Sequence, residues 1–163
     1  MIKKTIIEIS KNFLKLAEFC SDDINTASEM MVDSLKKGGK IIFCGNGGSA
    51  ADSQHLAAEL IGRYRINRDP IAALALTTDT SIITAVANDF HFNEIFSRQI
   101  EVLGNKNDLL YAISTSGKSQ NVINAIKTAK NNNIKTIGIT GSNIGDMKNI
   151  CDLTISVPSD RPD

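Results

Sequence analysis

The sequence predicts a single α/β domain in which helices cover both faces of a parallel sheet. From about residue 39 onward, short apolar runs alternate with helical patterns, which is typical of parallel strands joined by crossover helices. The runs are continuously apolar, so each strand should be buried on both faces. A length of 163 residues suits one core. We therefore expect a three-layer αβα sandwich with a five-stranded parallel sheet, in one domain spanning 1–163.

Two amphipathic helices are expected before the sheet, within residues 1–38. Apolar residues recur every three or four positions from Ile2 to Cys20, which indicates a helix with a narrow apolar stripe. Ser21 or Asp22 should cap a second helix, whose stripe continues until the glycines of "KKGGK" end it. So narrow a stripe favours packing between helices of different subunits.

Five strands and five helical segments follow over residues 39–163. The expected strands are "KIIFC", "IAALAL", "DLLYAIS", "KTIGIT" and "DLTISV". The expected helices span about 49 to 62, 80 to 88, 93 to 103, 119 to 131 and 144 to 149. No internal repeat or linker interrupts this order, so a second domain is not expected.

Composition argues against several classes of partner. Eighteen basic and eighteen acidic side chains cancel, so nothing would gather nucleic acid or an anionic membrane surface. No apolar run approaches the roughly 20 residues that cross a bilayer. The cysteines Cys20, Cys44 and Cys151 are scattered through apolar segments, which favours reduced, buried thiols and a cytoplasmic protein. Ligands should be small molecules or other proteins.

Glycine and hydroxyl residues follow two strands that should end at the same edge of the sheet, where open parallel sheets bind ligands. The glycine loop, Gly45 to Ser49, permits positive φ angles and close approach of a ligand. The serine loop, Ser114 to Ser119, places hydroxyl and N–H groups before a helix and could hold a phosphate. An ordinary turn with Ser119 as N-cap is the alternative. Neither loop has the spacing of a nucleoside triphosphate or dinucleotide motif.

His55 and Glu59 are four residues apart, so both project from one face of the helix at 49–62. This spacing suits two ligands of one metal ion, or a base beside its orienting partner. Histidine–glutamate pairs of this kind are more often surface pairs. Their position shortly after the glycine loop favours a functional role.

Several motifs, found in order along nearly the whole chain, resemble the sugar isomerase (SIS) domain and, within it, the phosphoheptose isomerases. They are "CGNGGSAADSQHLAAEL" with "GRY", "NDF" with "IFSRQ", "ISTSGKS" and "VPS". The resemblance implies a flavodoxin-like fold and the conversion of sedoheptulose 7-phosphate to D-glycero-D-manno-heptose 7-phosphate through an enediol. That reaction begins heptose synthesis for lipopolysaccharide or capsule. The resemblance also implies a homotetramer with active sites at subunit interfaces.

The resemblance assigns roles to individual residues. Glu59 would be the catalytic base, and His55 and Glu59 would bind one zinc ion per subunit. Two ligands are fewer than a zinc site usually has, so the others are expected from a C-terminal helix beyond the polar stretch "VPSDRPD". The residues that would contact the substrate are Asn46, Gly47, Gly48, Glu59, Asn88, Asp89, Ser114, Thr115, Ser116 and Ser119.

Two alternatives stay open. A non-catalytic SIS protein could bind a phosphosugar or associate with the replication initiator, but such proteins lack a glutamate at the position of Glu59. An isomerase of another ketose phosphate would need the same loop and the same base.

Overall fold

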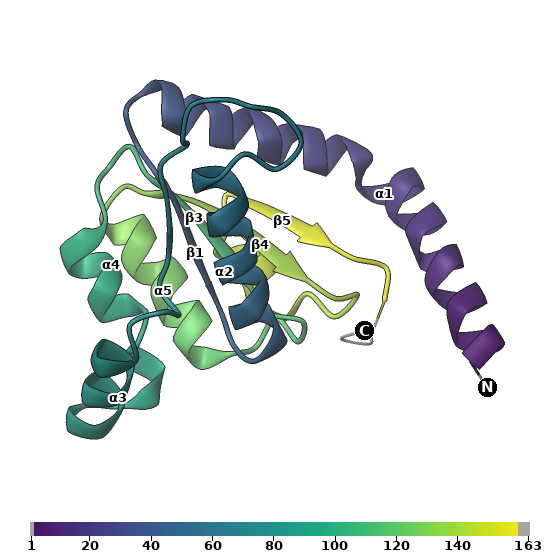
Figure 1. The fold of residues 1–163 in the computed structure, drawn as a ribbon. Coiled ribbons are helices and arrows are strands. Elements are labelled where there is room, and N and C mark those ends of the chain that lie inside the picture. Colours follow the sequence, from purple (N-terminus) through teal and green to yellow (C-terminus); the bar gives the residue numbers. More distant parts are fainter. Residues whose placement is uncertain (1, 160–163) are drawn as a thin grey trace.

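A five-stranded parallel sheet forms the centre of the computed structural model, which describes residues 2–159 (Figure 1). The strand order is β2-β1-β3-β4-β5, and every neighbouring pair is parallel. The strands are β1 Ile41–Gly45, β2 Ala73–Ala75, β3 Leu109–Ile113, β4 Lys135–Thr140 and β5 Leu153–Ser156. The predicted parallel sheet is therefore confirmed.

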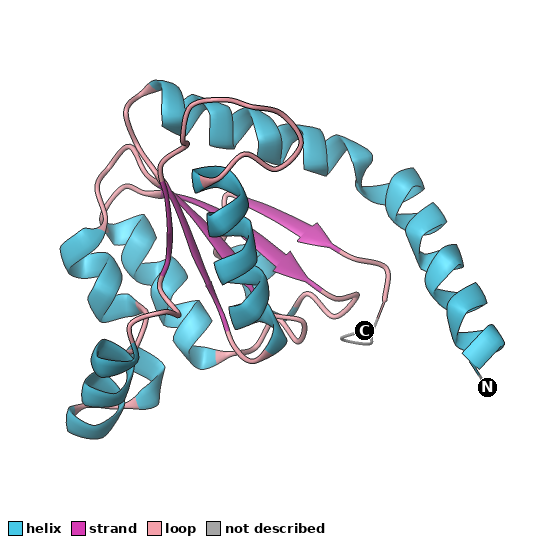
Figure 2. Ribbon diagram, in the orientation of Figure 1, coloured by secondary structure: helices cyan, strands magenta, loops and turns pink. Residues whose placement is uncertain are grey.

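Helices cover both faces of the sheet, as Figure 2 shows by colour. They are α1 Ile2–Lys36, α2 Gly48–Ile61, α3 Thr80–Asp89, α4 Ser97–Leu103 and α5 Gln120–Asn131, with short 3-10 turns η1 Phe92–Glu94 and η2 Gly145–Asn149. Helices α1 and α2 pack on one face, and α4 and α5 pack on the other. The three-layer arrangement agrees with the prediction.

The sheet is buried on both sides, which explains the continuous apolar runs. All five residues of β1 are buried. Ile42 contributes to the core beneath α4 and α5, whereas Ile41 and Phe43 contribute to the core beneath α1 and α2. Because successive side chains of a strand point to opposite faces, one strand serves both cores.

The prediction of two N-terminal helices is wrong, because α1 is one continuous helix of 35 residues. The Ser21 hydroxyl donates to the carbonyl of Ala17 within the helix instead of capping a new one. Cys20 and Ala27, seven residues apart, are both buried against the sheet side of the molecule. These two residues are two turns apart on the face of the helix that packs against the sheet. Their packing keeps the helix continuous through the polar residues between them.

Smaller departures concern the ends of elements. The helix expected at 93–103 is divided into η1 and α4, and the segment near 144–149 is a 3-10 turn. His91 begins η1, where its Nδ1 accepts a hydrogen bond from the Asn93 N–H at 3.1 Å. Residues 160–163, which belong to the stretch "VPSDRPD", lie outside the described part.

The three cysteines form no disulfide bond within the described residues. Cys20 and Cys44 are buried, Cys151 is partly buried, and all three are free thiols, as predicted. Among residues 2–159, no helix is both long enough and apolar enough to span a membrane.

Candidate active site

The glycine loop leads from the carboxyl end of β1 into α2. Gly47 has a φ of 57°, a conformation that favours glycine over residues with a side chain. It occupies the N-cap position of α2, and no side chain caps this helix. The N–H groups of Gly47 and Gly48 donate to no atom within residues 2–159 and are left for a ligand, whereas Ser49 and Ala50 donate to the carbonyls of Asn46 and Gly47.

The serine loop occupies the same place after β3, the neighbour of β1. Ser119 stands at the N-cap of α5, as the alternative interpretation required, but its side chain caps no N–H group. Its hydroxyl instead accepts a hydrogen bond from the buried Ser114 hydroxyl at 3.0 Å. By contrast, Asp79 caps α3 by accepting from the Ile82 N–H at 2.9 Å.

Two uncapped helix starts therefore lie side by side where the strand order reverses direction. Strand β1 has β2 on one side and β3 on the other, which makes the gap between β1 and β3 the switch point of the sheet. The N–H groups of Ser119, Gln120 and Asn121 donate to no atom within residues 2–159. The hydroxyls and N–H groups here can bind an anion such as phosphate.

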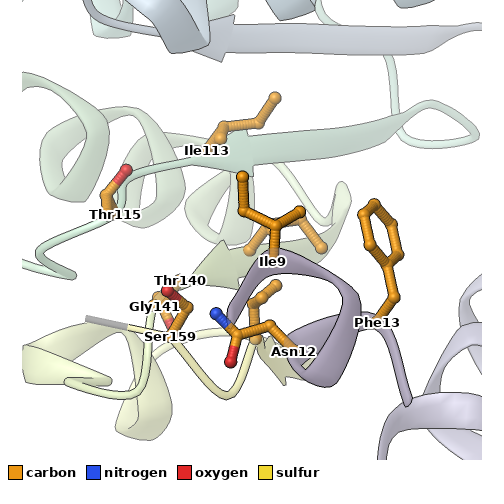
Figure 3. A pocket seen from close by; sticks show the side chains of 10 residues that line it. Ile9, Asn12, Phe13, Ile113, Thr115, Thr140, Gly141 and Ser159 are labelled. Atoms are coloured by element: carbon orange, nitrogen blue, oxygen red, sulfur yellow. The ribbon is translucent and has the colours of Figure 1, made fainter. Parts of the chain in front are cut away.

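The loop that follows β4 supports the serine loop. Gly141 N donates to the carbonyl of Thr115 at 2.9 Å, and Gly117 packs directly on the backbone of Ile144. A hollow of about 280 Å³ lies beyond these loops, between α1 and the ends of β3 and β4 (Figure 3). Its described lining residues include no charged side chain, and Thr115 of the serine loop is among them.

His55 and Glu59 lie in a different depression, of about 660 Å³, along the side of α2. His55 Nε2 is 3.7 Å from Glu59 Oε1, and the two side chains are 71% and 35% exposed. Phe43 and Tyr111 are among the other lining residues, with the chain that follows α2. The one-face prediction for the pair is confirmed.

One chain does not bring this pair to the glycine loop or the serine loop. None of the described lining residues of the depression belongs to the glycine loop or the serine loop. At 1.5 Å per residue, His55 and Glu59 lie about 10 and 16 Å along α2 from its first residue. The predicted site is therefore divided into an anion-binding part and a part that carries the carboxylate.

Arg68 was missed by the sequence reasoning and holds the end of α2. Its Nη1 donates to the carbonyl of Leu60 at 2.8 Å, and its Nη2 donates to the carbonyl of Glu59 at 2.7 Å. An arginine soon after a helix commonly binds the last carbonyls, which was the available signal. This contact fixes the helical turn that carries Glu59.

Asn88 and Asp89 end α3 and are exposed. Asn88 Nδ2 donates to Asp89 Oδ1 at 2.7 Å, and neither residue lines the depression of Glu59. Their proposed contact with substrate stays a prediction.

Asn46 of the glycine loop makes a contact that the sequence did not reveal. Its side-chain amide exchanges two hydrogen bonds with the amide of Asn121, at 2.9 and 2.8 Å. Asn121 lies in the first turn of α5, so this amide pair joins the two anion-binding loops.

His55 and Glu59 could supply part of a metal site. Zinc ligands at bonds of about 2.0–2.1 Å in a tetrahedron lie roughly 3.3 Å apart, close to the 3.7 Å between Nε2 and Oε1. Within residues 2–159, no group of three or more histidine, cysteine, aspartate or glutamate side chains could hold a metal ion. The pair therefore fits two positions of a site that needs at least one more protein ligand.

Comparison with known proteins agrees with this architecture. The family model described as "SIS domain" matches residues 6–141. The chain belongs to the SIS domain family. Its fold is also that of solved structures in this family: a phosphoheptose isomerase from Neisseria gonorrhoeae superposes with a TM-score of 0.93 at 39% identity, covering 99% of this chain and 86% of the other.

Curated relatives of this SIS domain are also named phosphoheptose isomerase. A phosphoheptose isomerase from Akkermansia muciniphila is 50% identical over 159 residues, which is 98% of this chain and 84% of the relative. One from Campylobacter jejuni is 54% identical over 144 residues, or 88% and 77% of the two chains. The resemblance to phosphoheptose isomerases seen in the motifs is confirmed.

Proposed function

We propose that this SIS domain is a phosphoheptose isomerase that interconverts sedoheptulose 7-phosphate and D-glycero-D-manno-heptose 7-phosphate. The observation that carries the proposal is Glu59, a half-buried carboxylate on the helix that begins at the glycine loop. Proteins with this name are similar to the chain over nearly its whole length. The heptose product would supply lipopolysaccharide or capsule synthesis.

The loops would bind the substrate phosphate. Hydroxyls of the serine loop and the free N–H groups at the start of α5 present donors to the anion, and the positive end of the helix adds to the attraction. The N–H groups of Gly47 and Gly48, at the start of α2, present further donors across the switch point. The phosphate would thereby orient the sugar chain, including its carbonyl end.

Glu59 would move the proton. The carboxylate takes the proton from the hydroxyl-bearing carbon beside the carbonyl, which leaves an enediolate, and delivers it to the former carbonyl carbon, while the hydroxyl proton passes to the former carbonyl oxygen. His55, 3.7 Å from the carboxylate, lies where its imidazole can contact the same oxygens of the sugar. Arg68 keeps the Glu59 backbone in place through its bond to the carbonyl.

We also propose that His55 and Glu59 hold a zinc ion, with further ligands from outside residues 2–159. When bound, such an ion would polarise the substrate carbonyl. The donor set supports this proposal, because imidazole nitrogen and carboxylate oxygen are both zinc ligands.

The complete site is proposed to form between subunits of a homotetramer. This would bring the carboxylate of one copy toward the anion-binding loops of another, which one chain holds apart. The N-terminal half of α1 supports assembly: Ile2, Ile6, Phe13, Leu14 and Phe19 are 60–75% exposed. A surface of this kind is typical of an interface. The free thiols are consistent with a cytoplasmic location.

The test uses sedoheptulose 7-phosphate in deuterated water, with and without added zinc, followed by NMR. Aldose product with deuterium at C2, the carbon beside its carbonyl, is expected. Glu59→Gln should abolish both product and label, whereas Glu101→Gln, an exposed carboxylate on α4, should leave both unchanged. Turnover of Glu59→Gln near that of the wild type would remove Glu59 from the mechanism.

The alternatives give different results in the same assay. An isomerase of another ketose phosphate would show label and product only with a substrate of different chain length. A non-catalytic phosphosugar-binding protein would bind the sugar phosphate without product or label.

A further inference from the structure

The amide pair of Asn46 and Asn121 joins the glycine loop to the first turn of α5, which is distant in sequence. Asn46 Nδ2 donates to Asn121 Oδ1 at 2.9 Å, and Asn121 Nδ2 donates to Asn46 Oδ1 at 2.8 Å, across 75 residues of chain. Two antiparallel bonds between planar amides allow one relative orientation, because loss of coplanarity weakens both bonds.

Asn121 is placed to hold this geometry firmly. It is only 2% exposed, and its Oδ1 also accepts a hydrogen bond from the Val122 N–H at 3.0 Å. The side chain thereby satisfies one N–H group in the first turn of α5 while it holds the glycine loop. Asn46 is half-buried and belongs to a loop whose next residue, Gly47, has a positive φ. Asn121, which is held in α5, therefore restricts the position of Asn46 and with it the glycine loop.

The two helix starts at the switch point depend on this pair for their separation. Asn46 immediately precedes Gly47, the N-cap of α2, and Asn121 is the second residue of α5. An anion that contacts both helix starts requires a particular gap between them. The strands beneath set that gap only through the loops that follow them, whereas the amide pair sets it directly.

We propose that Asn121 is a positioning residue for phosphate binding, which acts by fixing the distance between the glycine loop and the serine loop through Asn46. The proposal rests on the proposed function, because it presumes that both loops contact one substrate phosphate. It differs from a substrate-contacting role, because both polar atoms of the Asn121 side chain already form hydrogen bonds, with Asn46 and with the Val122 N–H.

The size of the effect follows from the population of the binding-competent arrangement. If the loops without the pair hold the correct gap for about a tenth of the time, the apparent Kd for phosphate rises about tenfold. The effect should fall on Kd and KM more than on kcat, because Glu59 lies about 16 Å along α2 from the glycine loop.

The chain offers a matched control in Asn124, which lies one turn later on α5. Its Nδ2 donates to the carbonyl of Asn93 at 3.2 Å and to Glu94 Oε1 at 3.0 Å, away from the glycine loop. Asn124→Ala removes the same kind of amide from the same helix. A loss of stability that acts indirectly on binding would appear in both variants.

The experiment measures the Kd of inorganic phosphate and of sedoheptulose 7-phosphate by calorimetry for wild type, Asn121→Ala, Asn46→Ala, the double variant and Asn124→Ala. Asn121→Ala should raise both Kd values about tenfold or more, with Asn124→Ala near wild type. Once Asn46 is alanine, adding Asn121→Ala should change Kd little further, because the partner is already absent. Unchanged affinity in Asn121→Ala, or effects of the two substitutions that multiply, would overturn the proposal.

A second variant keeps the test valid if Asn121→Ala does not fold. Asn121→Asp retains the shape and the acceptor for Val122 N–H and loses the donor to Asn46 Oδ1. Hydrogen exchange at the Ser49 and Ala50 amides, which donate to the carbonyls of Asn46 and Gly47, should be faster in this variant and unchanged in Asn124→Ala. Equal exchange in all proteins would contradict the proposal. Since the readouts are binding and exchange, they remain decisive even if the wild type shows no isomerase activity, which would refute only the proposed function.

Discussion

Replacement of Gly117 by alanine should show how far the contact between the serine loop and the loop after β4 supports phosphate binding. Comparison with a second glycine variant separates this effect from the ordinary cost of replacing a glycine. Gly117 has a φ of +63°, and a Cβ built there would lie 2.1 Å from the carbonyl oxygen of Ile144. Backbone atoms cannot yield as a flexible side chain can. The serine loop and the loop after β4 would therefore have to move apart, and the donors that face the phosphate would move with them.

Gly38 provides the control for this substitution. It also has a positive φ, +77°, but nothing lies within 4 Å of its added Cβ. It precedes β1, so it lies at the opposite edge of the sheet from the loops. Gly38→Ala should lose only the conformational term, about 1–2 kcal/mol. Gly117→Ala should lose that term and about 1–3 kcal/mol more for overpacking.

The assay combines urea unfolding at one protein concentration with the Kd for inorganic phosphate. Gly117→Ala should unfold at lower urea than Gly38→Ala and bind phosphate about tenfold more weakly, since displacement of about 1 Å has large effects on a positioned site. Gly38→Ala should bind phosphate as the wild type does. Equal unfolding free energies for the two variants, with unchanged phosphate binding, would refute the reasoning.

Two further predictions concern titratable groups. Burial raises the pKa of Cys44 to about 12 and that of Cys151 to about 11, so at pH 8 the thiolate of Cys44 is about one part in ten thousand. A disulfide reagent at pH 8 should modify these thiols far more slowly in native protein than in guanidinium, where all three cysteines should react at once; rapid native reaction of Cys44 would contradict this burial. Burial alone would raise the pKa of Asp152, but hydrogen bonds from the Thr136 hydroxyl and N–H, with nearby lysines, lower it below the usual 3.8. Because the folded pKa is the lower one, the stability that Asp152 contributes is present above about pH 4 and is lost as the pH falls through the folded pKa. Asp152→Asn should therefore lose less unfolding free energy than wild type on acidification in urea titrations, and parallel pH profiles would disprove the role.

Much of the fold could be predicted because local pattern and burial agree in an α/β protein. The expected strand "KTIGIT" coincides with β4, and the helix expected at about 80 to 88 is α3 at Thr80–Asp89. The prediction of two helices in the N-terminal region was wrong for a specific reason. Ser21 looks like a cap in sequence, but a serine within a helix can also bond to the carbonyl four residues earlier, as it does here.

The candidate site could be predicted in its parts but not in its assembly. Glycines and serines after apolar runs mark the anion-binding loops, and the spacing of His55 and Glu59 places them on one face. The contact of Asn46 with Asn121 spans 75 residues and has no local pattern. Arg68 donates to the Glu59 carbonyl across a loop, and loop conformations have no periodic sequence pattern from which this contact could be predicted.

By itself, the sequence determined the alternation of strands and helices, the two loops at one edge of the sheet and the membership of the SIS family. These features depend on short-range periodicity and on residue types such as glycine that only certain backbone conformations require. The tertiary structure decided two others: the continuity of α1, which packs Cys20 and Ala27 against the sheet side of the molecule, and the amide pair that joins the glycine loop to α5. Both depend on contacts between segments far apart in the chain, where geometry and not local preference selects the arrangement.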